Sequence, residues 1–402
     1  MDLDTEAAPA RAAAPLAGVL VADFSRVLAG PLASMFLADL GATVVKVERP
    51  GLGDDTRAWG PPFVAGTSTY YTSVNRNKRS VELDLAREAD RALARRLAAR
   101  ADVLIENYRP GKLAEFGLDA ATLARTNPRL VYCSISGFGT GAGAGLPGYD
   151  FVVQAVGGLM SITGDPGGPP MKVGVALVDV LTGLHATIGV LAALRERDAS
   201  GRGQVVEVNL LSSLIASLVN QGAGYLNGAG VPAAMGNRHP SIAPYETLAT
   251  EDGPLAVAVG NDRQFAAMAA AVDRPELATD PRFATNTARV LNRPALVGEL
   301  EAALGARPAG EWTAMLQACG VPCGPVNHID AAIALADRLG LAPVVRAGDG
   351  PQHVATLANP IGLSRSAVRY HRAPPALGAD NREVRAWLDG DATAPLDEFL
   401  DT

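Results

Sequence analysis

Two spacings of hydrophobic residues alternate along the first half of the chain. Short apolar runs predict buried strands at Gly18–Phe24, Ala42–Val47, Asp102–Ile105, Leu130–Ile135 and Val205–Val208. Apolar residues three and four positions apart predict helices at Pro31–Leu40, Arg87–Arg100, Asp150–Met160, Val180–Arg197 and Leu210–Leu226. Alternating strands and helices form βαβ units, so we expect an α/β fold with a doubly wound, mostly parallel sheet. Ligands of such sheets bind at the carboxyl ends of the strands.

The pattern changes beyond Gly228. Strands and helices of a smaller α+β domain are predicted at Tyr245–Leu248, Leu255–Val259, Arg263–Val272, Pro294–Ala303 and Gly310–Ala318. A length of 402 residues also favours two domains over one. We therefore expect a disordered tail at residues 1–16, a large α/β domain at 17–226, a small α+β domain at 227–331, and a C-terminal segment at 332–402 that returns to the large domain.

Composition narrows the class of protein. Hydrophobic residues make up 48% of the chain and charged residues 19%, as in folded proteins. No run approaches eighteen apolar residues, and the start of the chain lacks the features of a signal peptide. Three cysteines cannot form a disulfide framework, and Cys319 and Cys323 alone do not make a zinc site. A net charge of −7 gives no indication of nucleic-acid or membrane binding. We expect a cytoplasmic protein without a metal.

Several common catalytic patterns are absent or incomplete. The glycines of Ser136–Gly145 resemble a dinucleotide-binding loop, but they lead into Leu146-Pro147-Gly148, which cannot start the helix that such a loop requires. The sequence contains neither a G-x-S-x-G elbow nor an H-E-x-x-H motif. His185 lies six residues after Asp179, on a different face of the predicted helix, and is interpreted as a packed core residue.

Asp179 allows two interpretations. It stands between the apolar run Val173–Val178 and the predicted helix that begins at Val180. The residues alone favour an N-cap, because an Asp oxygen in that position accepts a hydrogen bond from a free backbone N–H. A helix N-terminus also stabilises an anion, so the same carboxylate would stay ionised and could act as a nucleophile without a general base.

Basic residues in three turns indicate a phosphate-bearing ligand. Arg49, Arg109 and Lys112 each lie in a turn that contains Pro or Gly and follows a predicted strand. The carboxyl ends of parallel strands meet at one edge of the sheet, so these cations are expected near the ligand-binding edge.

A series of motifs in order resembles the class III CoA-transferases, the family of formyl-CoA:oxalate and carnitine CoA-transferases. The similarity runs through most of the chain from about Gly18. It is carried by Asp23-Phe24-Ser25-Arg26-Val27-Leu28-Ala29-Gly30-Pro31, Val47-Glu48-Arg49, Asn77-Lys78-Arg79-Ser80, Ile105-Glu106-Asn107-Tyr108-Arg109-Pro110-Gly111, Gly148-Tyr149-Asp150, Gly201-Arg202-Gly203-Gln204 and Gly320-Val321-Pro322-Cys323-Gly324-Pro325. Each motif is weak by itself, and the ordered series is specific.

The resemblance implies an activity and a nucleophile. The family's catalytic aspartate matches Asp179 in Val175-Ala176-Leu177-Val178-Asp179. In such enzymes the carboxylate forms a mixed anhydride and then an aspartyl-CoA thioester, which divides one difficult exchange into easier steps. Coenzyme A, as acyl-CoA, is therefore the expected co-substrate, and a free carboxylic acid is the expected acceptor.

The resemblance also implies the binding residues. The family's CoA contacts match Arg26, Leu28, Ala29, Arg49, Leu83, Asp84, Leu85, Asn107, Tyr108, Arg109 and Tyr149. Two positions that are basic in some members are here Glu115 and Pro147, and Arg109 or Lys112 is expected to substitute. The glycine-run loop of the oxalate enzyme is replaced by Gly236, Asn237, Arg238 and His239. Arg238 can bind a second carboxylate through two hydrogen bonds. We therefore expect dicarboxylates such as succinate, malate or mesaconate as substrates, rather than oxalate.

Two other functions remain open at this point. The same family includes α-methylacyl-CoA racemases, but their catalytic His corresponds to Tyr149, and a neutral phenol is a poor base at pH 7. A non-catalytic CoA-binding protein, with Asp179 only as a cap, is the other alternative. The family further implies a homodimer of two interlocked ring-like subunits.

Overall fold

The computed structural model describes residues 14–64, 66–348, 353–390 and 396. Most of the predicted N-terminal tail, residues 1–13, lies outside the described residues. Ala14 is buried, and the N–H of Leu16 donates to the carbonyl oxygen of Leu40, so the last residues of that predicted tail are part of the fold.

The chain forms two compact units. The first comprises Met1–Gly157, Gly174–Gly222 and Ala342–Thr402, and the second comprises Gly158–Val173 and Ala223–Leu341. The short segment Gly158–Val173, which the sequence pattern places within the large domain, therefore belongs to the second unit.

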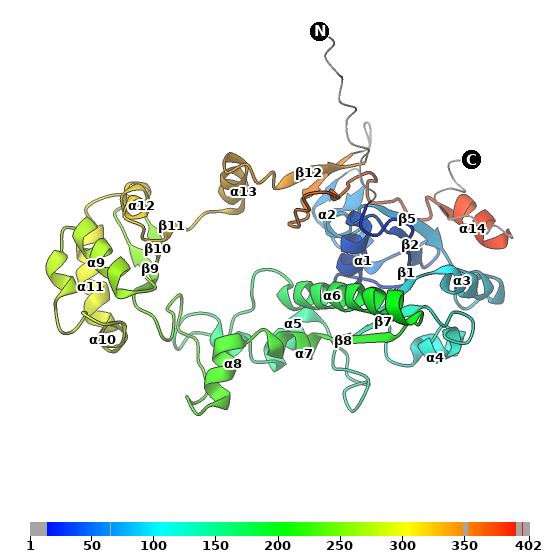
Figure 1. Cartoon of the computed structure of the whole chain (residues 1–402), viewed down its shortest axis with the longest axis horizontal. Helices are drawn as coiled ribbons and strands as arrows, with labels where there is room; N and C mark the ends of the chain where they lie inside the picture. Colours follow the sequence, from blue (N-terminus) through cyan, green and yellow to red (C-terminus); the bar gives the residue numbers. More distant parts are fainter. Residues whose placement is uncertain (1–13, 65, 349–352, 391–395, 397–402) are drawn as a thin grey trace, which may run out of the picture. The chain divides into compact units, whose positions relative to one another are not determined.

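A six-stranded parallel sheet forms the centre of the first unit (Figure 1). Its strands are β1 (Leu20–Asp23), β2 (Thr43–Glu48), β5 (Lys78–Glu82), β6 (Val103–Glu106), β7 (Val131–Ser136) and β8 (Val205–Asn209). They lie in the order β5-β2-β1-β6-β7-β8, and every neighbouring pair is parallel. The direction of winding reverses at β1, so the loops after β1 and β6 diverge and leave a crevice at the carboxyl edge.

Helices cover both faces of this sheet, because successive strand residues point to opposite sides. Val21 faces a core made with α1 (Ala29–Asp39) and α6 (Leu177–Ser200). Ala22 faces a core made with α3 (Glu88–Arg100) and with α14 (Asn381–Asp389) from the far end of the chain. The predicted α/β fold with a large parallel sheet is confirmed.

Shorter elements complete the first unit. They are η1 (Asp55–Ala58), β3 (Phe63–Val64), β4 (Thr67–Ser68), α2 (Thr69–Ser73), η2 (Lys112–Phe116), α4 (Ala120–Leu123), α5 (Asp150–Val156), α7 (Leu210–Ala216), β12 (Val344–Ala347) and β13 (Val354–Leu357). The prediction of one helix from Leu210 to Leu226 is wrong. The backbone turns at Val219, whose φ of 41° is in the left-handed region, and α8 (Val219–Leu226) starts there as a separate helix.

The second unit contains a three-stranded antiparallel sheet in the order β11-β10-β9. Its strands are β9 (Tyr245–Ala249), β10 (Pro254–Ala258) and β11 (Cys323–Pro325), and its helical segments are η3 (Met160–Ile162), α9 (Asp262–Ala271), η4 (Pro275–Ala278), α10 (Asn286–Leu291), α11 (Arg293–Leu304), α12 (Ala309–Ala318) and α13 (Ile329–Arg338). Leu248 and Leu255 on one face of the sheet are fully buried, in one core with Phe265 of α9 and Leu300 of α11.

Helix α6 is long and apolar enough to cross a membrane by length and hydropathy alone, a test that core helices also pass. Half of its most apolar window is buried, and the helix packs against α1, β7 and β8. Its burial within the first unit accounts for its apolar composition.

Candidate active site

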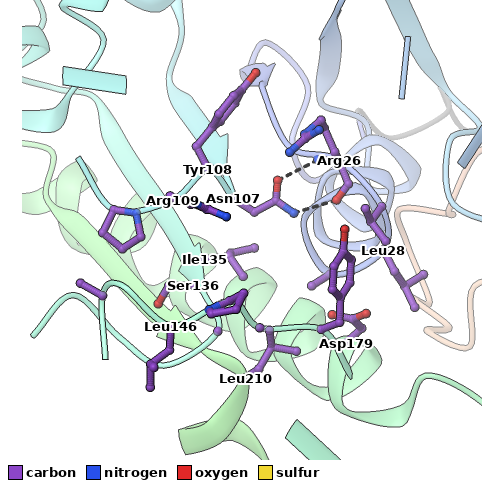
Figure 2. A pocket seen from close by; sticks show the side chains of 18 residues that line it. Arg26, Leu28, Asn107, Tyr108, Arg109, Ile135, Ser136, Leu146, Asp179 and Leu210 are labelled. Carbon is purple, nitrogen blue, oxygen red and sulfur yellow. Dashed lines mark hydrogen bonds between the residues drawn. The ribbon is translucent and has the colours of Figure 1, made fainter. Parts of the chain in front are cut away.

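The loops at the carboxyl ends of β1, β6 and β7 surround a cavity of about 260 Å³, called here the Asp179 pocket (Figure 2). It lies at the point where the sheet reverses its winding, which is where ligands of doubly wound sheets bind. Of the residues implied by the family resemblance, the pocket brings together Arg26, Leu28, Ala29, Asn107, Tyr108, Arg109, Tyr149 and Asp179. Ile135, Leu146 and Leu210 add apolar lining.

The loop after β1 is fixed by polar groups of the neighbouring loops. The N–H of Arg26 donates to Asn107 Oδ1 at 2.8 Å, and Asn107 Nδ2 donates to the carbonyl oxygen of Arg26 at 2.7 Å, as the dashed lines in Figure 2 show. Val27 has φ 71°, which is strained for a β-branched residue, and its N–H points to both oxygens of Asp54 at 3.3 Å. This bent backbone leads directly into Leu28 and α1.

Asp179 is the third residue of α6 and not its N-cap. The N-cap is Ala176, which makes no side-chain capping bond. Instead the carboxylate of Asp150, at the start of α5, accepts hydrogen bonds from the N–H groups of Val178 at 2.7 Å and of Asp179 at 3.2 Å. The prediction of an N-cap role for Asp179 is wrong, because the cap comes from a residue 29 positions away in the sequence.

The Asp179 carboxylate lies in an environment that disfavours its charge. The residue is only 8% exposed, and no described residue donates a hydrogen bond to its carboxylate. Burial, and secondly the negative charge of Asp150, raise the pKa of Asp179 to about 7. The expectation of an ordinary, fully ionised carboxylate at neutral pH is therefore wrong. A carboxylate of raised basicity with free oxygens is suited to act as a nucleophile or a base.

A second, open depression of about 760 Å³ adjoins the Asp179 pocket; we call it the basic depression. Four cationic side chains line it, together with Tyr108 and Glu115: Arg26, Arg49, Arg109 and Lys112. Some of this charge is compensated, since Asp55 pairs with Arg26 at 2.8 Å and with Arg49 at 2.7 Å, and Lys112 pairs with Glu115. Arg26 Nε is buried without a hydrogen-bond partner among the described residues, so a donor is available here for a ligand.

The glycine run after β7 closes a loop beside the pocket. A Cβ at Gly137 would lie 2.8 Å from the Cα of Gly148, and one at Gly148 would lie 2.7 Å from the Cα of Gly137. Only two glycines allow the backbones to approach so closely. Leu146 of this loop and Tyr149 just beyond it line the pocket, and Tyr149 is 59% exposed. The glycines thus serve loop closure, in a geometry unlike a dinucleotide-binding turn.

Leu83, Asp84 and Leu85 line neither the Asp179 pocket nor the basic depression. They follow β5, two strands from β1 in the sheet. Leu83 is buried in the core, and its N–H donates to the carbonyl oxygen of Glu48. These three residues are therefore not part of either lining, unlike the other residues that the resemblance assigns to CoA.

The predicted substrate loop, Gly236 to His239, belongs to the second unit. Gly236 has φ 65°, and Asn237 Nδ2 donates to Thr247 Oγ1 of β9 at 3.1 Å. Arg238 Nε donates to the carbonyl oxygen of Met235 at 2.9 Å, and Arg238 is an exposed residue. The His239 ring lies 5.2 Å from the Tyr245 ring. The loop is thus anchored on β9 and presents the Arg238 head group to solvent.

Three features near the pocket were not predicted from the sequence. The sequence predicts Asp150 only as the start of a helix and as part of a motif, and its capping role depends on tertiary structure. Tyr70 of α2 lies close enough to Asp179 that burial, followed by the charges of Asp179 and Asp150, raises the pKa of Tyr70 to about 12. Lys46 and Asp54 form a buried ion pair beneath the loop after β1. For this ion pair the sequence offered one local signal: Lys46 is a charged residue within a predicted buried strand, where a charge needs a partner.

Comparison with known proteins decides the family. The model of CoA-transferase family III matches residues 16–381. The chain belongs to CoA-transferase family III. Members of this family use CoA thioesters as co-substrates, and the chain is accordingly an enzyme of the CoA-transferase class. Among the described residues, no group of three or more His, Cys, Asp or Glu side chains could hold a metal ion.

Named relatives of this CoA-transferase cover most of its length. A succinate–glutarate CoA-transferase of Agrobacterium fabrum is 43% identical over 389 residues, which is 93% of this chain and 96% of the relative. An acetyl-CoA:oxalate CoA-transferase of Acetobacter aceti is 40% identical and covers 90% of this chain and 92% of the relative. The crystal structure of a CAIB/BAIF family protein from Brucella suis superposes with a TM-score of 0.84 at 42% identity, over 94% of this chain and 100% of that one.

Proposed function

We propose that this enzyme moves CoA from succinyl-CoA or a related dicarboxyl-CoA to a free dicarboxylic acid. The observation that carries the proposal is the Asp179 carboxylate, buried yet without a hydrogen-bond donor among the described residues, in a pocket that adjoins the basic depression. Relatives named for glutarate, mesaconate and citramalate support a dicarboxylate acceptor. The relative named for oxalate is consistent with the same class.

The basic depression is suited to the phosphates of CoA. Arg26, Arg49, Arg109 and Lys112 supply cationic donors, and phosphate is bound strongly by guanidinium groups. Arg109 has no ion pair or side-chain hydrogen bond within the described part of the chain, so it can bind a ligand without breaking one. The apolar lining of the Asp179 pocket then suits the thioester end of the molecule.

Asp179 would act as a covalent nucleophile. One of its oxygens bonds to the acyl carbon of the donor thioester, the carbon–sulfur bond breaks, and the thiolate leaves with the electron pair. The thiolate attacks the aspartyl carbonyl of the mixed anhydride and releases the donor acid. The acceptor carboxylate then attacks the aspartyl carbonyl of the thioester, the carbon–sulfur bond breaks, and a second mixed anhydride forms as the thiolate leaves. The thiolate attacks the acceptor's acyl carbon, the bond from that carbon to the Asp179 oxygen breaks, and the Asp179 carboxylate is freed. Each step replaces one activated acyl bond by another, so none is lost to water.

The loop Gly236 to His239 would select the acceptor. Arg238 is exposed, and the two terminal nitrogens of a guanidinium group match the two oxygens of a carboxylate. We assign to it the distal carboxylate of a dicarboxylic acid, with Asn237 and His239 as neighbouring polar groups. Monocarboxylates would lack this contact.

One observation favours a second candidate, an α-methylacyl-CoA racemase. A carboxyl with a pKa of about 7 is also suited to abstract a proton at neutral pH. Racemisation needs a second acid–base group on the other side of the carbon, and no histidine lines the Asp179 pocket among the described residues. Loss of an α-deuterium into water, without transfer of CoA, would identify this activity.

We also propose an interlocked homodimer in the cytoplasm. Neither α8 nor α13 has a buried residue, and both helices carry exposed apolar side chains. Leu226 and Ile329 are each 81% exposed. A second copy of the chain would cover these apolar side chains. Light scattering should then give twice the chain mass of 41.4 kDa, and linked rings should not exchange subunits with a tagged copy without unfolding.

Free Cys133, Cys319 and Cys323 are consistent with a reducing compartment.

A panel of acids tests the proposed activity. The purified enzyme is mixed with succinyl-CoA and, separately, with glutarate, mesaconate, malate, oxalate, acetate or butyrate, and new CoA esters are identified by mass. We expect dicarboxylates to accept CoA much faster than monocarboxylates. Preferential transfer to monocarboxylates would refute the proposed specificity. Transfer to none, together with loss of deuterium from an α-deuterated 2-methylacyl-CoA assayed separately, would favour the racemase.

A further inference from the structure

The Asp150 carboxylate lies at the N-terminus of α6, next to the turn that carries Asp179. Its Oδ2 accepts hydrogen bonds from the backbone N–H groups of Val178 and Asp179, and its Oδ1 accepts one from Gln154 Nε2 at 2.5 Å. Asp150 is 8% exposed and Gln154 is fully buried. Both oxygens of the Asp150 carboxylate therefore accept hydrogen bonds, which fix its orientation.

We propose that Asp150 is a positioning residue for Asp179. Asp150 holds the first turn of α6 in place, and its negative charge disfavours the ionised form of the Asp179 carboxyl. The inference deepens the proposed function and rests on it. The physical basis is that an N-cap contributed by another element fixes the helix end relative to that element, here α5 relative to α6. The Asp179 side chain belongs to the same turn, so its direction follows from the cap.

The two effects of Asp150 on Asp179 are separable. The two capping hydrogen bonds need only one acceptor oxygen, which an asparagine retains, while its amide group replaces the oxygen that accepts from Gln154. The electrostatic effect needs the charge, because two nearby carboxylates disfavour ionisation of each other. The pKa of Asp179 is raised first by burial and second by Asp150, so removal of the charge should reverse part of the rise and leave the rest.

The other groups around Asp179 do not duplicate this role. Helix α1 and the residue before it present Ala29 and Leu28, which carry no charge, and α7 presents Leu210. His185, further along α6, bonds to Ser213 of α7 at 3.0 Å. The remaining titratable or charged neighbours are Tyr70 of α2 and, in the pocket lining, Arg26, Tyr108, Arg109 and Tyr149. Asp150 is the carboxylate that contributes to the pKa of Asp179.

The experiment compares Asp150→Asn, which keeps the cap, with Asp150→Ala, which removes both cap and charge. Asp119→Asn is the matched control, because Asp119 also caps a helix, through the N–H of Thr122 in α4, away from the pocket. Two readouts are taken against pH on the full-length enzyme. One is kcat and KM for CoA transfer, and the other is the rate at which a water-soluble carbodiimide labels Asp179, measured by peptide mass.

The wild type is expected to show an inflection near pH 7 in both readouts. Asp150→Asn should shift it downward by roughly half a unit to one unit and keep kcat above pH 8 within about threefold. Asp150→Ala should lower kcat by more than about tenfold, because an unfixed helix turn misplaces the nucleophile. Asp119→Asn should change neither the inflection nor kcat.

Unchanged inflections in Asp150→Asn would overturn the electrostatic part, and equal kcat values for Asp150→Ala and the wild type would overturn the positioning part. The labelling measurement needs no CoA transfer. An inactive wild type would therefore count against the proposed function, while the labelling profile would still decide the role of the Asp150 charge.

Discussion

A Cβ atom at Gly183 would lie 2.7 Å from the carbonyl oxygen of Ala29, so α6 and α1 are packed backbone against backbone at this point. Gly183 is four residues after Asp179 and lies on the same face of the helix. The close packing therefore brings the face of α6 that carries Asp179 up to the residue that starts α1. Ala29 is itself part of the pocket lining.

Substitution of Gly183 by alanine should separate the two helices. We expect kcat for CoA transfer to fall by roughly tenfold to a hundredfold, since small displacements of reacting groups are costly. The free energy of unfolding should fall by about 1–3 kcal/mol from overpacking. The control is Gly298→Ala in α11, where the added methyl would meet nothing within 4 Å and should be neutral or stabilising. Wild-type activity in Gly183→Ala would show that this contact does not position Asp179.

Lys46 and Asp54 form a second structural support of the pocket. Their charged atoms are 2.9 Å apart, and both side chains are completely buried. Burial opposes the charge of Asp54, but Lys46 and the hydrogen bonds from Thr56 outweigh it, and the pKa of Asp54 is lowered. The same carboxylate accepts from the strained Val27, so it links the ion pair to the loop after β1.

Asp54→Asn should destabilise the fold by about 3–5 kcal/mol, because it leaves the buried Lys46 charge without its nearest partner. The control is Asp389→Asn, which breaks an exposed pair with Arg96 and should change the free energy of unfolding by less than about 1 kcal/mol. Urea unfolding of both variants measures the difference. Equal small effects would mean that the buried pair is not required for stability.

Asp179→Asn should make the protein more stable at neutral and alkaline pH. A carboxyl whose pKa is about 7 when folded and 3.8 when unfolded binds its proton more strongly in the folded state. The free energy of unfolding of the wild type therefore falls as pH rises from about 4 to about 7, by at most about 4 kcal/mol, and then levels off. Asparagine lacks this titration. Thermal unfolding of both proteins between pH 4 and pH 8.5 should show a gap that widens with pH; a constant gap would contradict the raised pKa.

Arg109 and Arg238 should affect different substrates. Arg109→Ala is expected to raise the KM for acyl-CoA far more than that for the acceptor, because Arg109 lines the basic depression. Arg238→Ala is expected to weaken dicarboxylate use by about 1.5–3 kcal/mol, the contribution of a hydrogen bond to a charged group, and to leave monocarboxylates unchanged. Each variant is the control for the other. If both raise the two KM values equally, neither assignment is correct.

Most of the first unit's sheet could be predicted because most of its strands are mainly apolar runs. β5 was missed, since Lys78–Glu82 contains three charged residues that are satisfied only in the folded state. Lys78, for instance, is fully buried beside Asp23 at 3.1 Å. The broken helix at Val219 was missed because its residues have helical spacing on both sides of the break. Local patterns do not report such tertiary effects.

The site shows the same limit. The motifs predicted that Arg26, Asn107 and Asp179 would act together, and the structure brings them to one pocket. The local pattern predicted an N-cap position and an ordinary pKa for Asp179. The actual cap is Asp150, which reaches α6 from another helix, and the pKa depends on burial and then on the charge of Asp150. Burial and long-range capping become visible only when the fold is known.

Trapping of a covalent intermediate tests the central claim most directly. The wild-type enzyme is incubated with succinyl-CoA, treated with hydroxylamine and digested, and the peptide masses are measured. We expect a hydroxamate on the peptide that contains Asp179, and neither this label nor CoA transfer in Asp179→Asn, which should fold and still bind CoA. A label on another residue, no label in an active enzyme, or near-normal transfer by Asp179→Asn would contradict a covalent role for Asp179.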